Sequence, residues 1–219
     1  MGFYRGPNIV TDGLVFAVDA GSTRSYPGSG TTTTSLVGSS TGTLSNGVAY
    51  VSGNGGSWDF DGVDDYIDTT FTLPAGNRSM DFWVYYNTLS STSGGGYSLM
   101  GVQQSGGSYL YTGITSNGVG YSYAGNTGGS YSYTFSAATW YHIACVMDSG
   151  TTRHYVNGAQ EATKTYTSSV ASTTEVMIGA INAQHEIDGL VPLTRIYNKA
   201  LTASEVLQNY NAQKTRFGL

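Results

Sequence analysis

Short apolar runs of strand length recur along most of the chain, and clusters rich in Gly, Ser and Asn separate them. Such clusters favour turns, so each run between them is expected to be a strand. The expected strands are 13–20, 79–86, 97–103, 109–114, 119–124, 131–135, 140–147, 152–156, 159–166 and 175–181. Short strands that follow one another without helices indicate an antiparallel sandwich or barrel.

Three segments have more specific patterns. Residues 13–20 form a run that is apolar except for Asp19, which is typical of a strand buried on both faces in the middle of a packed sheet. Residues 21–47 are rich in Gly, Ser and Thr and predict a long surface connection. The dipeptide Asn157-Gly158 is the strongest hairpin turn in the chain.

Five of the fourteen acidic residues fall within residues 59–68. One interpretation is a β-hairpin that turns at Asp61-Gly62, with Phe60 and Tyr66 anchored in the core. The other is a cation site, because clustered oxygen ligands in a loop are what calcium requires. The residue types alone favour the hairpin.

The C-terminal pattern is helical and predicts one helix from residue 203 to about residue 214. Thr202 and Glu205 form a capping box, and Leu201 and Val206 are spaced as a hydrophobic staple. The residues expected to face the sandwich are Ala203, Leu207 and Tyr210.

Composition agrees with a β-rich, turn-rich domain, since 11% of the 219 residues are charged while Gly numbers 31 and Tyr 18. We expect one domain over residues 12–213, with an N-terminal arm at 1–11 and a C-terminal tail at 214–219. A net charge of −5 with nine Lys and Arg argues against nucleic acid as a partner.

Cys145 is the single cysteine, so no internal disulfide can form. Met1 is not followed by a signal-peptide pattern, and no apolar stretch approaches the roughly 20 residues of a membrane span. We therefore expect folding in a cytoplasm and no membrane insertion.

Six segments in order resemble the laminin G-like, concanavalin A-like jelly-roll proteins, especially those in structural proteins of tailed bacteriophages. They are 12–20, 25–30, 60–67, 140–143, 155–158 and 195–206. The resemblance implies an all-β, two-sheet antiparallel jelly-roll sandwich with one short C-terminal helix. The chain departs from the family where Thr33 and Ser35 replace a usual Trp and Asp.

Residues 208–218 resemble the phage subset in particular, which implies a non-enzymatic virion structural protein in capsid decoration or in a tail or fibre. Other virion proteins and further copies of the chain would be its partners, and residues 1–8 and 214–219 are the expected docking arms. The alternative is a carbohydrate-binding, lectin-like adhesion module that contacts host glycans.

Catalysis is not expected. Jelly-roll glucanases carry Glu-x-Asp-x-x-Glu, and here Glu186 and Asp188 begin that pattern but Val191 stands where the second Glu is needed. A degenerate hydrolase would need that Glu from elsewhere. Cys145 lies in an apolar strand and is expected to be a small core residue. His142, His154 and His185 lack zinc-like spacing and are expected to be structural histidines.

Two sets of residues are candidates for binding. The tyrosine pairs alternate along their strands and either line the core, which we favour, or form an aromatic platform for sugars or a protein. They are Tyr109, Tyr111, Tyr121, Tyr123, Tyr131 and Tyr133. The family sometimes holds calcium at the sandwich edge, which implies the candidate ligands Asp19, Asp61, Asp64 and Asp188.

Overall fold

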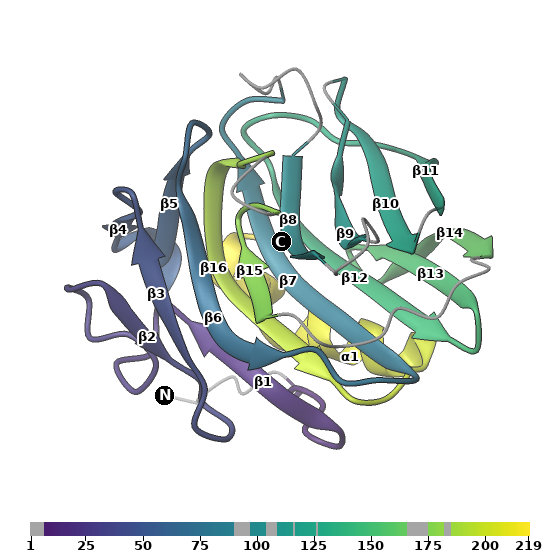
Figure 1. Ribbon diagram of the computed structural model, residues 1–219, viewed down its shortest axis with the longest axis horizontal. Helices are drawn as coiled ribbons and strands as arrows, with labels where there is room; N and C mark the ends of the chain where they lie inside the picture. The colour runs from purple at the N-terminus through teal and green to yellow at the C-terminus, as the bar shows by residue number, and fades with distance from the viewer. Residues whose placement is uncertain are drawn as a thin grey trace.

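A computed structural model describes residues 7–89, 97–103, 109–115, 117–125, 127–165, 175–181 and 185–219. They form two antiparallel β-sheets packed face to face, with one α-helix outside one of the sheets (Figure 1). The predicted two-sheet sandwich with a C-terminal helix is therefore confirmed.

The first sheet, called sheet A, contains β1 (Leu14–Asp19), β4 (Ala49–Val51), β5 (Ser57–Asp61), β7 (Arg78–Tyr86), β12 (Trp140–Asp148), β13 (Thr151–Val156), β14 (Ala159–Thr165) and β16 (Asp188–Tyr197). Its order is β14-β13-β12-β7-β16-β5-β4, and β1 pairs with β16 beside that path.

The second sheet, called sheet B, contains β2 (Thr32–Thr34), β3 (Thr41–Ser45), β6 (Tyr66–Thr72), β8 (Tyr97–Gln103), β9 (Tyr109–Ile114), β10 (Val119–Gly125), β11 (Thr127–Thr134) and β15 (Glu175–Ile178). Its order is β11-β10-β9-β8-β15-β6-β3-β2. The helical elements are η1 (Gly53–Gly55), α1 (Ala203–Gln213) and η2 (Lys214–Phe217).

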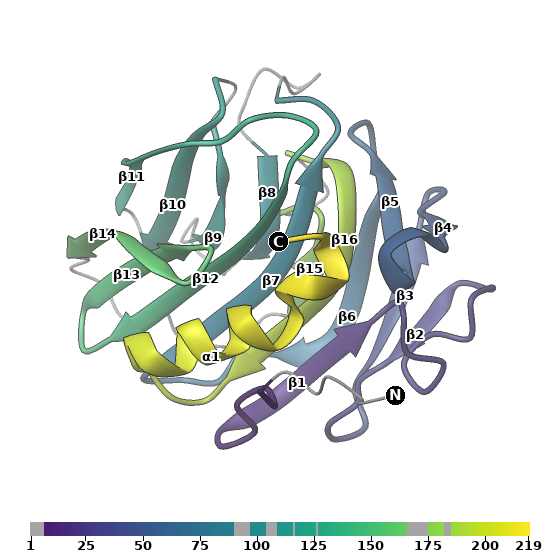
Figure 2. The same ribbon diagram turned by 180° about the vertical axis from the view of Figure 1, so that it is seen from behind.

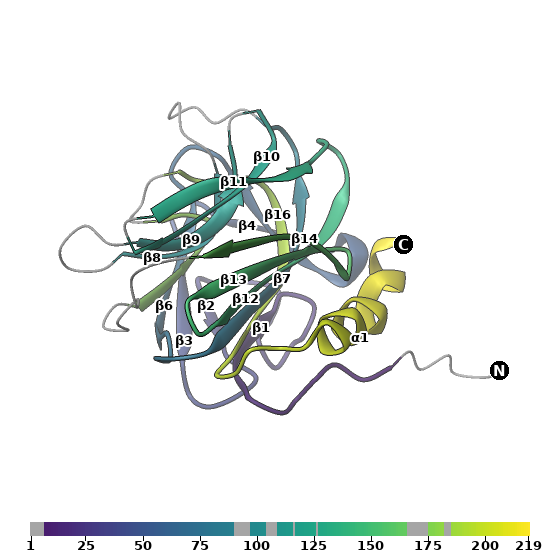
Figure 3. The same cartoon turned by 90° about the vertical axis from the view of Figure 1, so that its right-hand side faces the viewer.

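Sheet A is the middle layer of three, since sheet B covers its inner face and α1 its outer face (Figures 2 and 3). Two consecutive residues of β7 show that the strand is buried on both faces. Phe82 belongs to the core between the sheets, whereas Trp83 packs against Phe217 on the helix side. Burial on both faces explains why the central strands β7 and β12 are largely apolar.

Strand β1 is buried as its sequence predicts, but it does not lie in the middle of the sheet. Among the described strands, it pairs only with β16. Its other edge is covered by side chains: Ala17 N donates to Ser35 Oγ (3.1 Å) and Asp19 N to Ser25 Oγ (3.1 Å). Ser35, where the family usually has Asp, therefore accepts a hydrogen bond from the strand edge.

The prediction of a long surface connection over residues 21–47 was wrong, because β2 and β3 lie within it. Thr33 and Leu44 point into the core and Tyr26 is buried. Strands of three and five residues, with Thr and Gly at inward positions, are too short to show a period of two in the sequence.

The hairpin expected at Asp61-Gly62 was also wrong. Strand β5 pairs with β16 and β4 in sheet A, whereas β6 pairs with β3 and β15 in sheet B. Residues 61–65 therefore cross from one sheet to the other, and we call this segment the arch. Phe60 anchors it in the core as expected, but Ile67 does so on the other side, not the half-buried Tyr66.

Two other local predictions are confirmed. Asn157 (φ 50°) and Gly158 (φ 81°) form the β13–β14 hairpin turn. Helix α1 begins with the predicted capping box of Thr202 and Glu205, and Leu201 and Val206 share an apolar cluster.

The buried face of α1 differs in part from the prediction. Val206 and Asn209 are buried, while Ala203 and Leu207 are exposed. Tyr210 is half-buried and stacks on Trp83 of sheet A, so it faces the sandwich as predicted. The apolar positions alone were misleading because the central buried residue is polar: Asn209 Nδ2 donates to Asp81 Oδ2 (2.8 Å) in sheet A.

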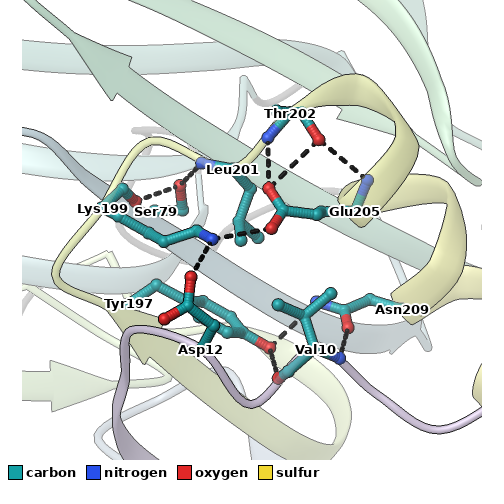
Figure 4. Close-up of polar contacts among 9 residues, drawn as sticks. All are labelled: Val10, Asp12, Ser79, Tyr197, Lys199, Leu201, Thr202, Glu205 and Asn209. Carbon is teal, nitrogen blue, oxygen red and sulfur yellow. Dashed lines mark hydrogen bonds and ion pairs between the residues drawn. The ribbon is translucent and has the colours of Figure 1, made fainter.

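Both ends of the described chain pack onto the domain. Val10 N donates to Asn209 Oδ1 (2.9 Å) and Lys199 Nζ bonds Asp12 Oδ2 (2.6 Å), as Figure 4 shows. Phe217 is 5% exposed and stacks on Trp83. Residues 214–217 are thus a docked turn rather than a free arm, while residues 1–6 of the other expected arm lie outside the described residues.

Candidate functional site

The arch connects β5 to β6 at the rim of the sandwich, at the upper left in Figure 1. One oxygen each from Asp61, Asp64 and Asp65 lies within 4.8 Å of the others. The backbone bends tightly here: Val63 N donates to Asp61 Oδ1 (2.9 Å), and Asp61 N to Asp65 Oδ2 (3.1 Å). These bonds close the arch in place of a strand ladder.

Gly62 is required where the arch passes β16. A Cβ at this position would lie 2.7 Å from the Asp188 Cβ, and its φ is 73°. Glycine alone combines this conformation with so close an approach.

Asp65 is the buried member of the three. It is 3% exposed, and its Oδ1 has no hydrogen-bond partner among the described residues. Burial raises the pKa of Asp65 to about 6; the hydrogen bond from Asp61 N lowers it, and the nearby charges of Asp61, Asp64 and Asp59 add to the rise. The sequence prediction did not include this residue, because nothing in the sequence distinguishes a buried Asp from an exposed one.

Asp188 lies beside the arch, paired with Asp61 across β16 and β5. Both of its carboxylate oxygens accept hydrogen bonds, Oδ1 from Asn87 Nδ2 (3.0 Å) and Oδ2 from Thr88 Oγ1 (2.9 Å). The pKa of the neighbouring Asp59 is raised, first by burial and then by Asp188 and Asp61, against a lowering hydrogen bond from Asn87.

Asp19 lies away from the arch. It pairs with Leu193, five residues along β16 from Asp188, or roughly 17 Å at strand spacing. Its carboxylate accepts two bonds from Arg216 Nη1 (3.0 Å each). Of the four carboxylates expected as calcium ligands, the structure brings together Asp61, Asp64 and Asp188, adds Asp65, and leaves Asp19 apart.

The residues present fit a hard cation. Asp61 and Asp64 are exposed carboxylates, and the unpartnered Asp65 Oδ1 is a buried acceptor that an ion would satisfy. The residues that could hold the ion are therefore Asp61, Asp64 and Asp65, with Asp188 as a neighbour already engaged by Asn87 and Thr88.

The candidate tyrosines that the structure describes do not share one environment. Tyr131 is buried and stacks on His154 at 4.5 Å, and Tyr133 packs against the core beside Phe135. For these two the core interpretation is confirmed. Tyr121 is half-buried, and the side chains of Tyr109, Tyr111 and Tyr123 lie outside those that the structure describes.

The outer face of sheet B carries hydroxyl groups that the sequence analysis did not single out. Its exposed residues on β2, β3 and β6 are Thr32, Thr34, Thr43, Asp68, Thr70 and Thr72, which we call the hydroxyl face. The register forms a row across three strands, since Thr32 pairs with Thr43 and Thr43 with Asp68. Among the described elements, the helix covers only sheet A (Figures 2 and 3).

A second polar cluster lies buried between sheet A and α1. Asp81 accepts from Arg195 Nη2 (2.6 Å) and Nε (2.9 Å), from Asn209, and lies 3.1 Å from His142 Nε2. Burial acts to raise the pKa of Asp81, but Arg195 and the bonds from His142 and Asn209 hold it below its usual range. The helix covers this cluster, so we assign it a structural role.

The remaining candidates for chemistry are buried residues with structural contacts. Cys145 is 1% exposed in the core, and burial raises the pKa of its thiol to about 12 despite the charge of Arg78. His154 lies between the sheets, 3.0 Å from Ser122 Oγ. The expectation that Cys145 is a core residue is confirmed, and His142 and His154 are buried as structural histidines, while His185 is half-buried.

The two-sheet topology and the helix define a concanavalin A-like sandwich. The chain belongs to the family described as the concanavalin A-like lectin/glucanases superfamily (Laminin_G_3), whose sequence model matches residues 60–207. A search of curated proteins found no significant match. No helix among the described residues has the length and apolarity needed to span a bilayer.

Several solved structures share the fold. Trypanosoma rangeli sialidase in complex with sialic acid is 16% identical with a TM-score of 0.73, covering 95% of this chain and 34% of the sialidase. Domain 4 of the arabinanase AbnA from Geobacillus stearothermophilus, in complex with arabinotriose, is 18% identical with a TM-score of 0.68, covering 90% of this chain and 98% of that domain.

The receptor-binding domain of botulinum neurotoxin type G is 16% identical with a TM-score of 0.71, covering 92% of this chain and 52% of that domain. The chain thus spans about a third of the sialidase and nearly all of the arabinanase domain. These likenesses confirm the fold, and they give no support to the phage subset expected from residues 208–218.

Proposed function

We propose that this chain is a non-enzymatic carbohydrate-binding module that takes an extended glycan across the hydroxyl face of sheet B. The observation that carries the proposal is the row Thr32, Thr43 and Asp68, which is exposed on a face that the helix leaves uncovered. The opposite face of the sandwich is occupied by α1.

The geometry of the hydroxyl face suits a polymer of sugars. Neighbouring strands lie about 4.8 Å apart and alternate residues of one strand about 6.8 Å apart. Threonine hydroxyls donate and accept hydrogen bonds, and the Asp68 carboxylate accepts them. Tyr66, half-buried beside Ser45 on the same face, adds a ring edge for the apolar side of a sugar.

The family supports this choice of ligand. Lectins give the family its description, and domain 4 of the arabinanase, which the chain matches over nearly its full length, was solved with arabinotriose. Arabino-oligosaccharides are therefore the first probe, followed by a glycan array that includes sialylated glycans.

The test compares glycan binding by calorimetry in the wild type and in Thr43→Val, Asp68→Asn and Thr163→Val. Losing one hydrogen bond to the ligand should weaken binding by about tenfold, and more for a charged partner. Thr163 is exposed on β14 of sheet A, so Thr163→Val is the matched control. Absence of saturable binding to any glycan, or equal loss in the control, would overturn the proposal.

A role in a phage virion stays a prediction. It depended on the likeness of residues 208–218, and the packing of Asn209 on Asp81 and of Phe217 on Trp83 gives two residues of that segment a role within the domain. Finding the polypeptide in purified particles, with its copy number, would establish that role and would separate capsid decoration from a tail or fibre.

A further inference from the structure

Half of sheet B comes from a long part of the chain that carries no formal charge. No Asp, Glu, Lys or Arg occurs in residues 82–147, and β8, β9, β10 and β11 all lie within that range. Tyr, Ser, Gly and Thr make up most of these four strands. Residues of these types form hydrogen bonds and apolar contacts but offer no counter-charge to an ionised ligand.

The charges that sheet B does carry are negative. Its eight strands contain two charged residues, Asp68 on β6 and Glu175 on β15. Both are exposed, Asp68 within the hydroxyl face and Glu175 paired with Thr72 of that face. Within the described part of the chain, neither forms an ion pair. A ligand on the hydroxyl face therefore meets two carboxylates that no Lys or Arg neutralises.

The Lys and Arg residues that the structure describes lie outside the strands of sheet B. Arg78 and Arg195 are buried in sheet A, and Arg153 and Lys164 lie on β13 and β14 of the same sheet. Arg24 is exposed in the connection between β1 and β2. The others, in the β16–α1 connection and in η2, are Lys199, Lys214 and Arg216. The strands under the hydroxyl face thus lack the cations that proteins use to hold carboxylate, sulfate or phosphate groups.

We propose that the hydroxyl face selects uncharged glycans and rejects acidic ones, with Asp68 and Glu175 as the residues that set this selectivity. The inference rests on the proposed glycan binding and names the class of glycan. A sugar hydroxyl can donate a hydrogen bond to the Asp68 carboxylate, whereas an ionised uronic, sialic or sulfate group has no proton to donate and is repelled. Repulsion between unit charges at contact distance weakens binding by about tenfold at a protein surface.

The experiment uses a glycan array that holds pairs of oligosaccharides with one backbone and different charge, followed by calorimetry on the bound members. The pairs are N-acetyllactosamine with and without sialic acid, and oligogalacturonides with and without methyl esters; arabinotriose is a further uncharged probe. The wild type should bind the uncharged member of a pair at least about tenfold more tightly. Raising the salt concentration should narrow that ratio and leave the affinity for the uncharged member unchanged, because salt screens only the repulsion.

Two variants and a control assign the selectivity to residues. The double variant Asp68→Asn, Glu175→Gln should bring the affinities for the two members of a pair within about threefold of each other. Glu161→Gln removes a carboxylate on β14 of sheet A and should keep the wild-type ratio. The ratio is the readout because it separates selectivity from the general loss of affinity that Asp68→Asn also causes.

The outcomes distinguish this inference from the proposed function. Equal or tighter binding of the acidic members by the wild type would overturn the selectivity and leave glycan binding intact. An unchanged ratio in the double variant would overturn the assignment to Asp68 and Glu175. Absence of binding to every glycan of the array would overturn both the selectivity and the proposed function.

Discussion

At the scale of single residues, burial holds polar side chains in a protonation state that they would not have in water at the same pH. His154 is fully buried between the sheets, stacked on Tyr131 and bonded to Ser122. Burial, assisted by the charge of Lys164, lowers its pKa to about 4. The folded protein therefore keeps this imidazole neutral at a pH where the unfolded chain protonates it.

The consequence is an acid-dependent loss of stability. Between pH 6.5 and pH 4 the unfolded state binds a proton at His154 that the folded state does not, so the free energy of unfolding falls as the pH falls. This residue contributes a loss of about 3 kcal/mol over that window. Urea unfolding of wild type and His154→Gln from pH 4 to 7 checks it: the variant should show a shallower decline, and parallel curves would contradict the assignment.

At the scale of elements, one polar cluster sets how the helix docks. Asp81 on β7 is bonded to Arg195 on β16 and Asn209 on α1, and Asn209 in turn accepts from Val10 N. The same contacts extend through Tyr197 to the Val10 carbonyl (Figure 4). A sheet strand, the helix and the N-terminal segment thus depend on one buried carboxylate.

Removing that charge should be strongly destabilising. Asp81→Asn leaves Arg195 buried, 3% exposed, without a counter-charge, which costs about 3–5 kcal/mol. Asp148→Asn is the matched control, because its ion pair with Arg153 is about one-third exposed and should contribute no more than about 1 kcal/mol. Equal unfolding midpoints for the two variants in urea would show that the cluster does not anchor the helix.

The C-terminal turn η2 should contribute to stability as part of the domain. Phe217 packs on Trp83 at 4.2 Å and on Trp140 at 4.6 Å. Truncating it to Ala should reduce the free energy of unfolding by about 3 kcal/mol, whereas Leu219→Ala, at a side chain 45% exposed, should change little. Thermal unfolding distinguishes these outcomes, and an unaffected Phe217→Ala would restore the view of residues 214–219 as a free tail.

At the scale of the whole molecule, the sandwich could be predicted because its signals are local. Period-two alternation, the Asn157-Gly158 turn and the Thr202–Glu205 capping box each act over a few residues. The errors arose where partners are distant in sequence. Residues 59–68 look like a hairpin because strand pattern and turn chemistry say nothing about which sheet each strand joins.

The candidate site residues divide in the same way, into those that local sequence reveals and those that depend on contacts distant in sequence. Asp61 and Asp64 could be chosen from the sequence because carboxylates clustered in a loop are visible there, whereas the role of Asp65 depends on its burial. Asp19 was predicted from the family resemblance, and in the structure its carboxylate accepts a hydrogen bond from Arg216, 197 residues away. The hydroxyl face was missed because its row combines β2, β3 and β6, which only the sheet register aligns.

The sequence by itself therefore determined the fold class, the main strands, the helix with its cap and the acidic segment, since backbone propensity and turn chemistry are properties of neighbouring residues. The tertiary structure alone decided that the acidic segment joins the two sheets, that Asn209 lies on the buried face of α1, and which sheet the helix covers. These features depend on burial and on charges brought together across more than a hundred residues, as Asp81 and Asn209 are, and no local pattern encodes such contacts.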